Sequence, residues 1–374
     1  MNKTIITWGW AALLALPAGA QVSQFQPGHL AVLRAGDGVM DLHLRQTPMF
    51  IDQFEANASN SSPSFTARIP ISGPEELFIN GHAATEGNLT RSADHTLLAF
   101  EGYGGVGLLQ TNGTPSTMDI PRGGCTIDVS GKVHTFLYGG VPVGTKANPR
   151  GLATDGSNNF WGCGNATGAM YFNPVDQKTP VRFSALPNSR AVKIIGNALY
   201  MTMNAGDAYA DGQKAGIYGF QPDPLPRSAD TEITLVVPTA EQYKKVVGFD
   251  MDSAGTVAYT SDVSAGVQKY VKSGGAWSFA YNFKIPQVIP ADQNNSAGCF
   301  GLAVDFSGKN PIIYATTTEG YGSSVNSNRV VKIVDTGADA AVVTLACTGS
   351  TNIAFRGIDF TPEAKPSAMA ATRN

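Results

Sequence analysis

The sequence predicts an all-β protein built from a repeated unit. Its 374 residues include 42 glycines and only 15% charged residues, a composition typical of many short strands joined by tight turns. Six stretches share a pattern in which a small residue or asparagine precedes a branched or aromatic apolar residue. The aligned apolar residues are Leu89, Leu152, Val192, Phe249, Leu302 and Ile358, which lie 40 to 63 residues apart. This spacing fits four antiparallel strands with their turns, so each repeat is predicted to form one sheet.

Each repeat begins with an inner strand and a tight hairpin. In the copy at 247–260, the strand VGFDM is followed by the turn DSAG and the strand TVAYT. Glycine, aspartate, asparagine and serine in these turns match the conformations that tight hairpins require. An outer strand pair follows, such as GVQKYVKSGGAWSFAYNF at 266–283. No amphipathic helical stretch interrupts the strands, and the predicted architecture is therefore a β-propeller.

The two ends of the chain are predicted to complete one blade together. The last repeat, FRGIDFTPE, offers a single strand, whereas HLAVLRAGDG, PMFIDQFEANA and SFTARIPI offer three strands that lack an inner partner. Pairing them closes the ring and removes an exposed sheet edge. We expect one propeller of six four-stranded blades over residues 21–361, with seven blades as the alternative if residues 28–83 contain another. Residues 362–374 are expected to form a disordered tail.

Residues 1–20 have the pattern of a signal peptide. Lys3 supplies a positive charge, IITWGWAALLALP is an apolar core, and Ala18–Ala20 fits a cleavage site before Gln21. A buried N-terminal strand is the alternative. We expect a secreted protein, extracellular or periplasmic. The net charge of −3 gives no electrostatic basis for binding nucleic acid, and no later stretch is apolar enough to span a membrane.

Four cysteines remain in the mature chain. An even number in an oxidising compartment predicts two disulfides, with single buried thiols as the alternative. Of the three possible connectivities, the predicted strand order favours the one with two local pairings. These are Cys125 with Cys163 and Cys299 with Cys347.

The repeats resemble those of uncharacterised exported bacterial propeller proteins. The resemblance rests on inner strands with arginine and glycine before an apolar residue, such as PRGLATDG at 149–156, and on hairpins such as RSADH at 91–95. It spans nearly the whole mature chain, but its motifs are structural. The resemblance implies a fold and an exported location. It implies no particular reaction, because propellers include lyases, lactonases, sialidases, quinoprotein dehydrogenases and binding scaffolds.

One face of the predicted propeller collects the candidate binding residues. The inner strands begin at this face, and the loops between the second and third strands of each blade lie there too. Glu-Gly-Tyr-Gly occurs in two of these loops, at 101–104 and 319–322. The candidate rim residues are Glu101, Tyr103, Asn204, Asp207, Asp262, Glu319 and Tyr321. The alternative is that the motif recurs only because equivalent blades need equivalent turns.

Arginine occupies the position before the small residue in three repeats, as Arg150, Arg190 and Arg356. Converging guanidinium groups require an anionic partner. That partner is either an internal carboxylate or the carboxylate, phosphate or sulfate of a ligand, such as a uronic-acid polymer. In a lyase, the arginines would neutralise the uronate while Tyr103, Tyr321 or His82 moves the proton.

Three function classes follow from these observations. We favour a secreted binding or scaffold propeller whose partner is an acidic polysaccharide or an extracellular protein. A polysaccharide lyase acting on an acidic glycan is the alternative. A metal- or cofactor-dependent hydrolase or dehydrogenase ranks last, since the five histidines lack metal-ligand spacing and GYGGVG precedes no helix. No metal or cofactor is therefore expected.

Overall fold

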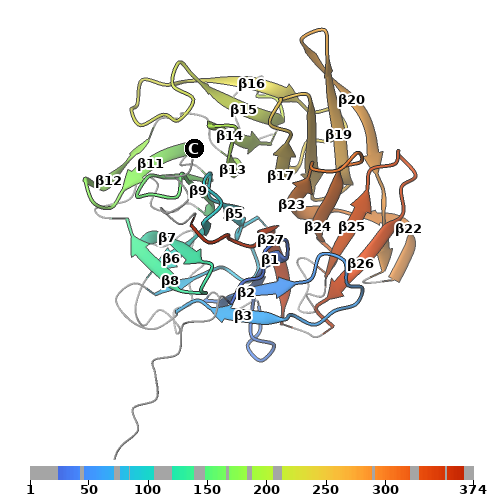
Figure 1. The fold of residues 1–374 in the computed structure, drawn as a ribbon, viewed down its shortest axis with the longest axis horizontal. Helices are drawn as coiled ribbons and strands as arrows, with labels where there is room; N and C mark the ends of the chain where they lie inside the picture. The colour runs from blue at the N-terminus through green and yellow to red at the C-terminus, as the bar shows by residue number, and fades with distance from the viewer. Residues whose placement is uncertain are drawn as a thin grey trace, which may run out of the picture.

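The computed structural model describes residues 24–42, 46–70, 76–83, 85–104, 120–138, 148–165, 168–182, 188–204, 213–288, 291–320, 328–349 and 352–365. Within these ranges every regular element is a β-strand. The strands form six blades around a central channel, as Figure 1 shows. The predicted all-β propeller with six blades is confirmed. The described strands between 28 and 83 belong to the closing blade and its neighbour.

Four blades are regular, with their strands in chain order from the channel outwards. The first of these contains β9 (Pro149–Thr154), β10 (Phe160–Gly164), β11 (Gly168–Asn173) and β12 (Gln177–Arg182), and the second contains β13 (Ser189–Ile195), β14 (Ala198–Met203), β15 (Gly216–Gln221) and β16 (Glu232–Pro238). The third contains β17 (Val246–Met251), β18 (Val257–Asp262), β19 (Gly266–Ser273) and β20 (Ala276–Phe283), and the fourth contains β23 (Cys299–Asp305), β24 (Ile312–Thr317), β25 (Arg329–Val334) and β26 (Val342–Cys347). A separate hairpin, β21 (Ile285–Val288) and β22 (Ala291–Ala297), connects the third and fourth blades.

The closing blade joins both ends of the chain, as predicted. Its order is β27 (Ala354–Phe360), β1 (Leu30–Ala35), β2 (Met49–Phe54) and β3 (Phe65–Arg68). The C-terminal strand is thus the inner strand of a blade whose outer strands come from the N-terminal region. The predicted tail is described to residue 365, and the backbone N–H of Glu363 donates to the carbonyl of His95 at 2.8 Å.

The remaining blade departs from the repeat. It contains β4 (Leu77–Phe78), β5 (Thr90–Arg91), β6 (Leu97–Gly104), β7 (Arg122–Asp128) and β8 (Val133–Leu137). Its inner strand β5 is short and pairs with one end of β6, while β4 pairs with the other end. Between β4 and β5, Gly87 has φ +87°, a conformation that favours glycine. The chain therefore leaves the regular inner-strand path just before β5.

The inner strands approach one another most closely at the small residue of each repeat. A Cβ on Gly301 would lie 2.6 Å from the carbonyl oxygen of Arg356 in the next blade, and one on Gly248 would lie 2.7 Å from that of Phe300. A Cβ on Gly357 would collide with backbone atoms as well. The repeated small residue thus lets the backbones of neighbouring blades meet around the channel.

A second repeated contact connects neighbouring blades. The hydroxyl of Thr316 accepts the N–H of Gly301 at 2.9 Å and donates to the carbonyl of Arg356, in the next blade, at 2.5 Å. Ser261 and Thr202 make the same pair of bonds in the two preceding blades. The ladder between the first two strands shifts register at each of these points. The hydroxyl therefore satisfies backbone groups that the irregular ladder leaves unpaired.

The predicted disulfides are wrong. All four cysteines are free: Cys125, Cys163 and Cys299 are buried in three different hydrophobic clusters, and Cys347 is exposed. Cys163 lies opposite Gly151, at the place that Thr202 occupies in the next blade. Strand alternation points three of the cysteines into separate cores. Burial also raises the pKa of the Cys125 thiol well above its usual value.

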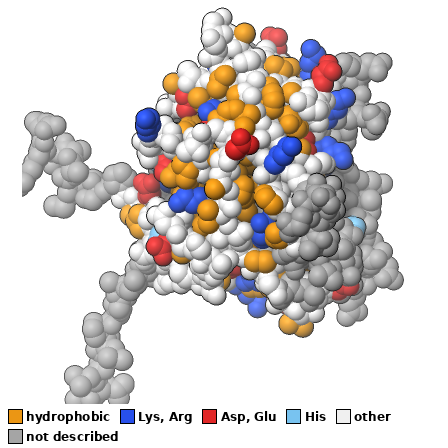
Figure 2. Space-filling model, turned by 90° about the vertical axis from the view of Figure 1, so that its right-hand side faces the viewer, with side chains coloured by type: hydrophobic (Ala, Val, Ile, Leu, Met, Phe, Trp, Pro, Cys, Tyr) orange, Lys and Arg blue, Asp and Glu red, His pale blue; other side chains and the backbone are white. Residues whose placement is uncertain are grey.

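The edge of the disc is formed by the outer strands. Figure 2 shows hydrophobic side chains interspersed with basic and acidic ones across one part of this edge. The large hydrophobic residues exposed there include Phe279 on β20 and Val343 on β26. No helix that could cross a membrane occurs in the described part of the chain.

We expect Gly301→Ala to destabilise the fold and Gly151→Ala to be tolerated. The added methyl group at Gly301 meets backbone, and overpacking of this kind typically costs about 1–3 kcal/mol. At Gly151 the nearest atoms lie 3.4 Å away, which is an ordinary contact distance. Urea unfolding followed by tryptophan fluorescence measures both variants. Equal losses of stability would contradict the close approach of the inner strands.

The cysteine arrangement predicts a simple thiol count. We expect a thiol reagent to titrate one group, Cys347, in the native protein and four after unfolding without a reductant. Burial keeps the other three thiols inaccessible and protonated. The matched variant Cys347→Ser should show no reactive thiol when native and three when unfolded. A lower count in the unfolded variant would demonstrate a disulfide.

Candidate functional site

The three predicted arginines lie on one arc of the channel mouth. The inner strands follow one another around the channel in the order β27, β5, β9, β13, β17 and β23. Arg356, Arg150 and Arg190 lie near the starts of β27, β9 and β13. The equivalent residues on the other side, Val247 and Phe300, are apolar and buried. We call this end of the channel, where the inner strands begin, the upper mouth, and the opposite end the lower mouth.

Backbone and amide groups hold two of these arginines. Nη1 of Arg150 donates to Oδ1 of Asn188 at 2.8 Å and to the carbonyl of Ser189 at 2.9 Å. Nη2 of Arg356 donates to the carbonyl of Gly81 at 3.0 Å, and this side chain is only 1% exposed. These contacts fix the positions of the two guanidinium groups.

Arg190 is the most accessible of the three, because its side chain is only partly buried. Its carbonyl accepts the side-chain amide of Asn88 at 2.7 Å. The backbone N–H of Asn88 donates to the carbonyl of Arg150 at 3.0 Å. Asn88 therefore connects the start of the irregular blade to the arginine arc.

Glu86 is a fully buried carboxyl group beside this arc. Its Oε1 accepts the hydroxyl of Tyr103 at 2.5 Å and the side-chain amide of Asn148, and its Oε2 accepts the N–H of Asn80 at 3.0 Å. Burial raises the pKa of Glu86, although these hydrogen bonds and the charge of Arg150 act in the opposite direction. The sequence analysis missed Glu86. It is an acid in the one irregular inner-strand segment, and no repeat pattern marks it.

Glu101, the first residue of one Glu-Gly-Tyr-Gly motif, is also buried. Its Oε1 accepts the hydroxyl of Tyr138 at 2.5 Å, and a Cβ on Gly162 would collide with this oxygen. Burial raises the pKa of Glu101 to about 8, with the hydrogen bond from Tyr138 and the charge of Arg122 partly offsetting this effect. Glu101 therefore holds its proton at neutral pH.

Tyr103 of the same motif is a buried hydrogen-bond donor. Its ring lies 5.6 Å from that of Phe78, and the guanidinium of Arg122 lies 5.2 Å from its ring centre. Burial, followed by the charge of Glu86, raises the pKa of Tyr103 well above its usual value. A hydroxyl in this state retains its proton, which does not suit a general base.

The second copy of the motif anchors the β21–β22 hairpin. Glu319 binds Arg329 through two contacts, Nε to Oε2 at 2.7 Å and Nη2 to Oε1 at 3.0 Å. Oε1 of Glu319 also accepts the N–H of Val288 at 2.6 Å, and Nη2 of Arg329 donates to the carbonyl of Pro286 at 2.6 Å. Both glutamates of the repeated motif are thus buried anchors rather than exposed rim residues. Tyr321 lies outside the described residues.

The other candidates are spread over the same face. His82 is exposed, in the loop whose Gly81 carbonyl binds Arg356. Asn204 is buried, and Asp262 is a buried acceptor of the N–H groups of Lys245 and Ser264. Asp207 lies outside the described residues. The structure therefore groups Tyr103 with Glu86, Asn148, Arg122 and Arg150, and it places Glu319 in a separate ion pair.

Comparisons with known proteins assign no family. A scan against family models finds no match, and a search of curated proteins finds none either. Among solved structures, the chain is similar to a hypothetical selenium-binding protein from Sulfolobus tokodaii, with 8% identity, a TM-score of 0.47, and coverage of 89% of this chain and 93% of that one. It is also similar to the Cps50 (Swd1) β-propeller domain of Myceliophthora thermophila, with 8% identity, a TM-score of 0.44, and coverage of 75% of this chain and 92% of that one. A third similar structure is that of the RRP9 WD40 repeats, with 10% identity, a TM-score of 0.43, and coverage of 90% of this chain and 88% of that one. Similarity at these levels carries no functional argument.

The raised pKa of Glu101 predicts a pH-dependent stability. The folded protein keeps a proton, up to a pKa of about 8, that the unfolded chain releases near 4.5. The free energy of unfolding should therefore fall as the pH rises through this window, by about 1.4 kcal/mol per pH unit at most. Glu101→Gln keeps the neutral shape and removes this contribution. We expect its stability relative to wild type to increase from pH 5 to pH 8, as measured by urea unfolding.

The matched control is Glu55→Gln, because Glu55 is an exposed glutamate. Its stability relative to wild type should stay constant over the same pH range. A pH-independent difference between Glu101→Gln and wild type would contradict a protonated Glu101.

Proposed function

We propose that this protein is a ligand-binding propeller that recognises an anionic group at the upper mouth. The observation that carries the proposal is the charge balance there. Four strands present arginines at this end of the channel: Arg122, Arg150, Arg190 and Arg356. Two buried carboxyl groups accompany them, Glu86 and Glu101, and burial raises the pKa of both. Among these six side chains, positive charge is therefore in excess at neutral pH.

An acidic polysaccharide is the ligand class that we propose. A guanidinium group presents a planar set of donors that matches a carboxylate, and uronate polymers repeat that carboxylate along the chain. The signal peptide predicted at 1–20 supports an extracellular or periplasmic location, where such polymers occur. An extracellular protein with an acidic segment is the other outcome that the test below can reveal.

The state of Tyr103 favours binding over lyase chemistry. A lyase needs a group that accepts the proton next to the uronate carboxylate. Tyr103 is buried, its hydroxyl donates a hydrogen bond to Glu86, and its pKa is raised. These properties make it part of the scaffold that supports Arg122 and Asn148.

The test is calorimetric titration of the mature protein with polygalacturonate and alginate, with dextran as the neutral polymer. We expect the two uronate polymers to bind and dextran not to bind at the upper mouth. Arg190→Ala should weaken binding by about tenfold or more, since a hydrogen bond to a charged group contributes about 1.5–3 kcal/mol. Higher salt should weaken it further. The matched control, Arg227→Ala, removes an exposed arginine from a loop outside the mouth.

Two results would overturn the proposal. The first is failure of both uronate polymers to bind, or binding that Arg190→Ala leaves unchanged. In that case an acidic extracellular protein becomes the partner to search for. The second is a rise in ultraviolet absorbance from an unsaturated uronate product, which would identify the protein as a lyase.

A further inference from the structure

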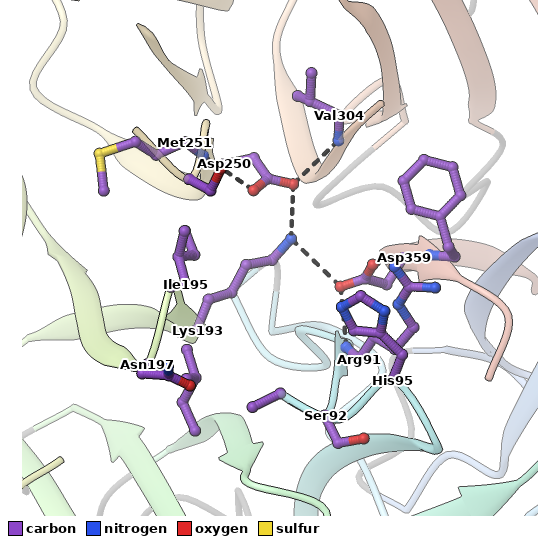
Figure 3. Close-up of a pocket in the computed structure, with 15 residues that line it drawn as sticks. Arg91, Ser92, His95, Lys193, Ile195, Asn197, Asp250, Met251, Val304 and Asp359 are labelled. Carbon is purple, nitrogen blue, oxygen red and sulfur yellow. Dashed lines mark hydrogen bonds and ion pairs between the residues drawn. The ribbon is translucent and has the colours of Figure 1, made fainter. Parts of the chain in front are cut away.

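The lower mouth of the channel contains a polar cavity of about 310 Å³. Its floor is an ion-pair cluster centred on Lys193, as Figure 3 shows. Nζ of Lys193, from β13, lies 3.3 Å from Oδ2 of Asp250 on β17 and 3.3 Å from Oδ2 of Asp359 on β27. It also donates to the carbonyl of Leu302 on β23 at 3.2 Å. Because β13 and β27 are opposite one another in the ring, Lys193 spans the channel.

This floor is held in place by the backbone. Oδ2 of Asp250 accepts the N–H of Val304 at 3.1 Å, and Oδ2 of Asp359 accepts the N–H of Arg91 at 3.0 Å. Lys193 is 9% exposed and Asp359 is 6% exposed. Burial opposes the charged form of Lys193, but the two carboxylates outweigh it and raise the pKa of its amine. The cavity is therefore preformed and does not need a ligand to order it.

The alternating charges on the floor disfavour a charged ligand. An anion placed in the cavity would approach Asp250 and Asp359, whereas a cation would approach Lys193 and Arg91. Neither an anionic nor a cationic ligand would have a favourable position there, because each charged group on the floor already has an opposite charge beside it. The lining instead favours a neutral molecule that forms several hydrogen bonds.

Hydrogen-bonding capacity remains on the floor and at the rim. Among the described residues, Oδ1 of Asp250 accepts the N–H of Met251 at 3.0 Å, and Oδ1 of Asp359 accepts the N–H of Phe360 at 2.8 Å. A carboxylate oxygen has two acceptor positions, so each of these oxygens retains one for a ligand hydroxyl. The rim offers a side-chain amide and a hydroxyl, both exposed, on two adjacent hairpins. These belong to Asn197 and Ser253.

Apolar side chains complete the lining. Ile195, Met251 and Phe360 lie beside the charged floor in the same cavity. A small molecule with hydroxyl groups on its edge and C–H groups on its faces matches this combination, and the volume lies at the lower end of the range for ligand pockets. We infer that the lower mouth, through the Lys193–Asp250–Asp359 floor and the Asn197–Ser253 rim, is a binding site for a neutral monosaccharide. This site is separate from the upper mouth and independent of the function proposed there.

Saturation-transfer NMR on the full mature chain tests this inference, with glucose, galactose, mannose and xylose as the probes. We expect transfer to at least one of these sugars. The double variant Asn197→Ala/Ser253→Ala should reduce its affinity about tenfold or abolish transfer, because it removes rim contacts and leaves the buried floor intact. The matched control Asn158→Ala removes an exposed asparagine from a neighbouring hairpin outside the cavity, and it should bind as wild type does.

Three outcomes would overturn the inference: transfer to none of the four sugars, transfer that the double variant leaves unchanged, and binding of glucosamine or glucuronate that is stronger than that of every neutral sugar and is lost in the double variant. The third would show that the cavity selects a charge. The variant Arg190→Ala distinguishes the upper-mouth proposal from the lower-mouth inference. It should reduce uronate binding at the upper mouth and leave transfer to the neutral sugar unchanged. Thermal unfolding of each variant verifies that it is folded.

Discussion

The close approach of the inner strands around the channel is the constraint on which the rest of the fold depends. At three of the six inner strands, the backbone of a neighbouring blade leaves no room for a side chain at the point of contact. Gly248, Gly301 and Gly357 occupy these points, and the hydroxyls of Ser261 and Thr316 then connect each blade to the next. Cys163 occupies the corresponding position in another blade, opposite Gly151. Its thiol is similar in size to these hydroxyl groups and lies inside a hydrophobic cluster.

The blade that departs from this arrangement contains the buried polar cluster. Its short inner strand leaves space beside β6, and Gly87 turns the chain so that Glu86 enters that space. Burying polar and charged groups is costly unless they are hydrogen-bonded, and Tyr103, Asn80 and Asn148 supply the required partners. A regular blade would close the ring without burying this polar network. The irregular blade therefore departs from local structural rules in the way that functional sites typically do.

The two mouths of the channel differ in their electrostatics. Three inner strands carry an arginine near their start at the upper mouth, and burial raises the pKa of the nearby Glu101 to about 8. At the lower mouth, Lys193 is compensated by Asp250 and Asp359 within one buried cluster. Because Lys193 spans the channel near one end, a buried ion-pair cluster lies between the two mouths.

The architecture is predictable from the sequence, because local periodicity and turn chemistry specify strands and their pairing. The six aligned apolar residues are all buried, and both chain ends contribute to one blade. Arg150, Arg190 and Arg356 lie near the starts of inner strands, which the same pattern predicts. The surroundings of each side chain depend on how the blades pack. The alternation of a strand tells which face a residue occupies. It does not tell that other strands and loops cover Glu101 and Glu319, or that blades distant in sequence surround Lys193. Burial and charge pairing at those positions depend on contacts that no local pattern records.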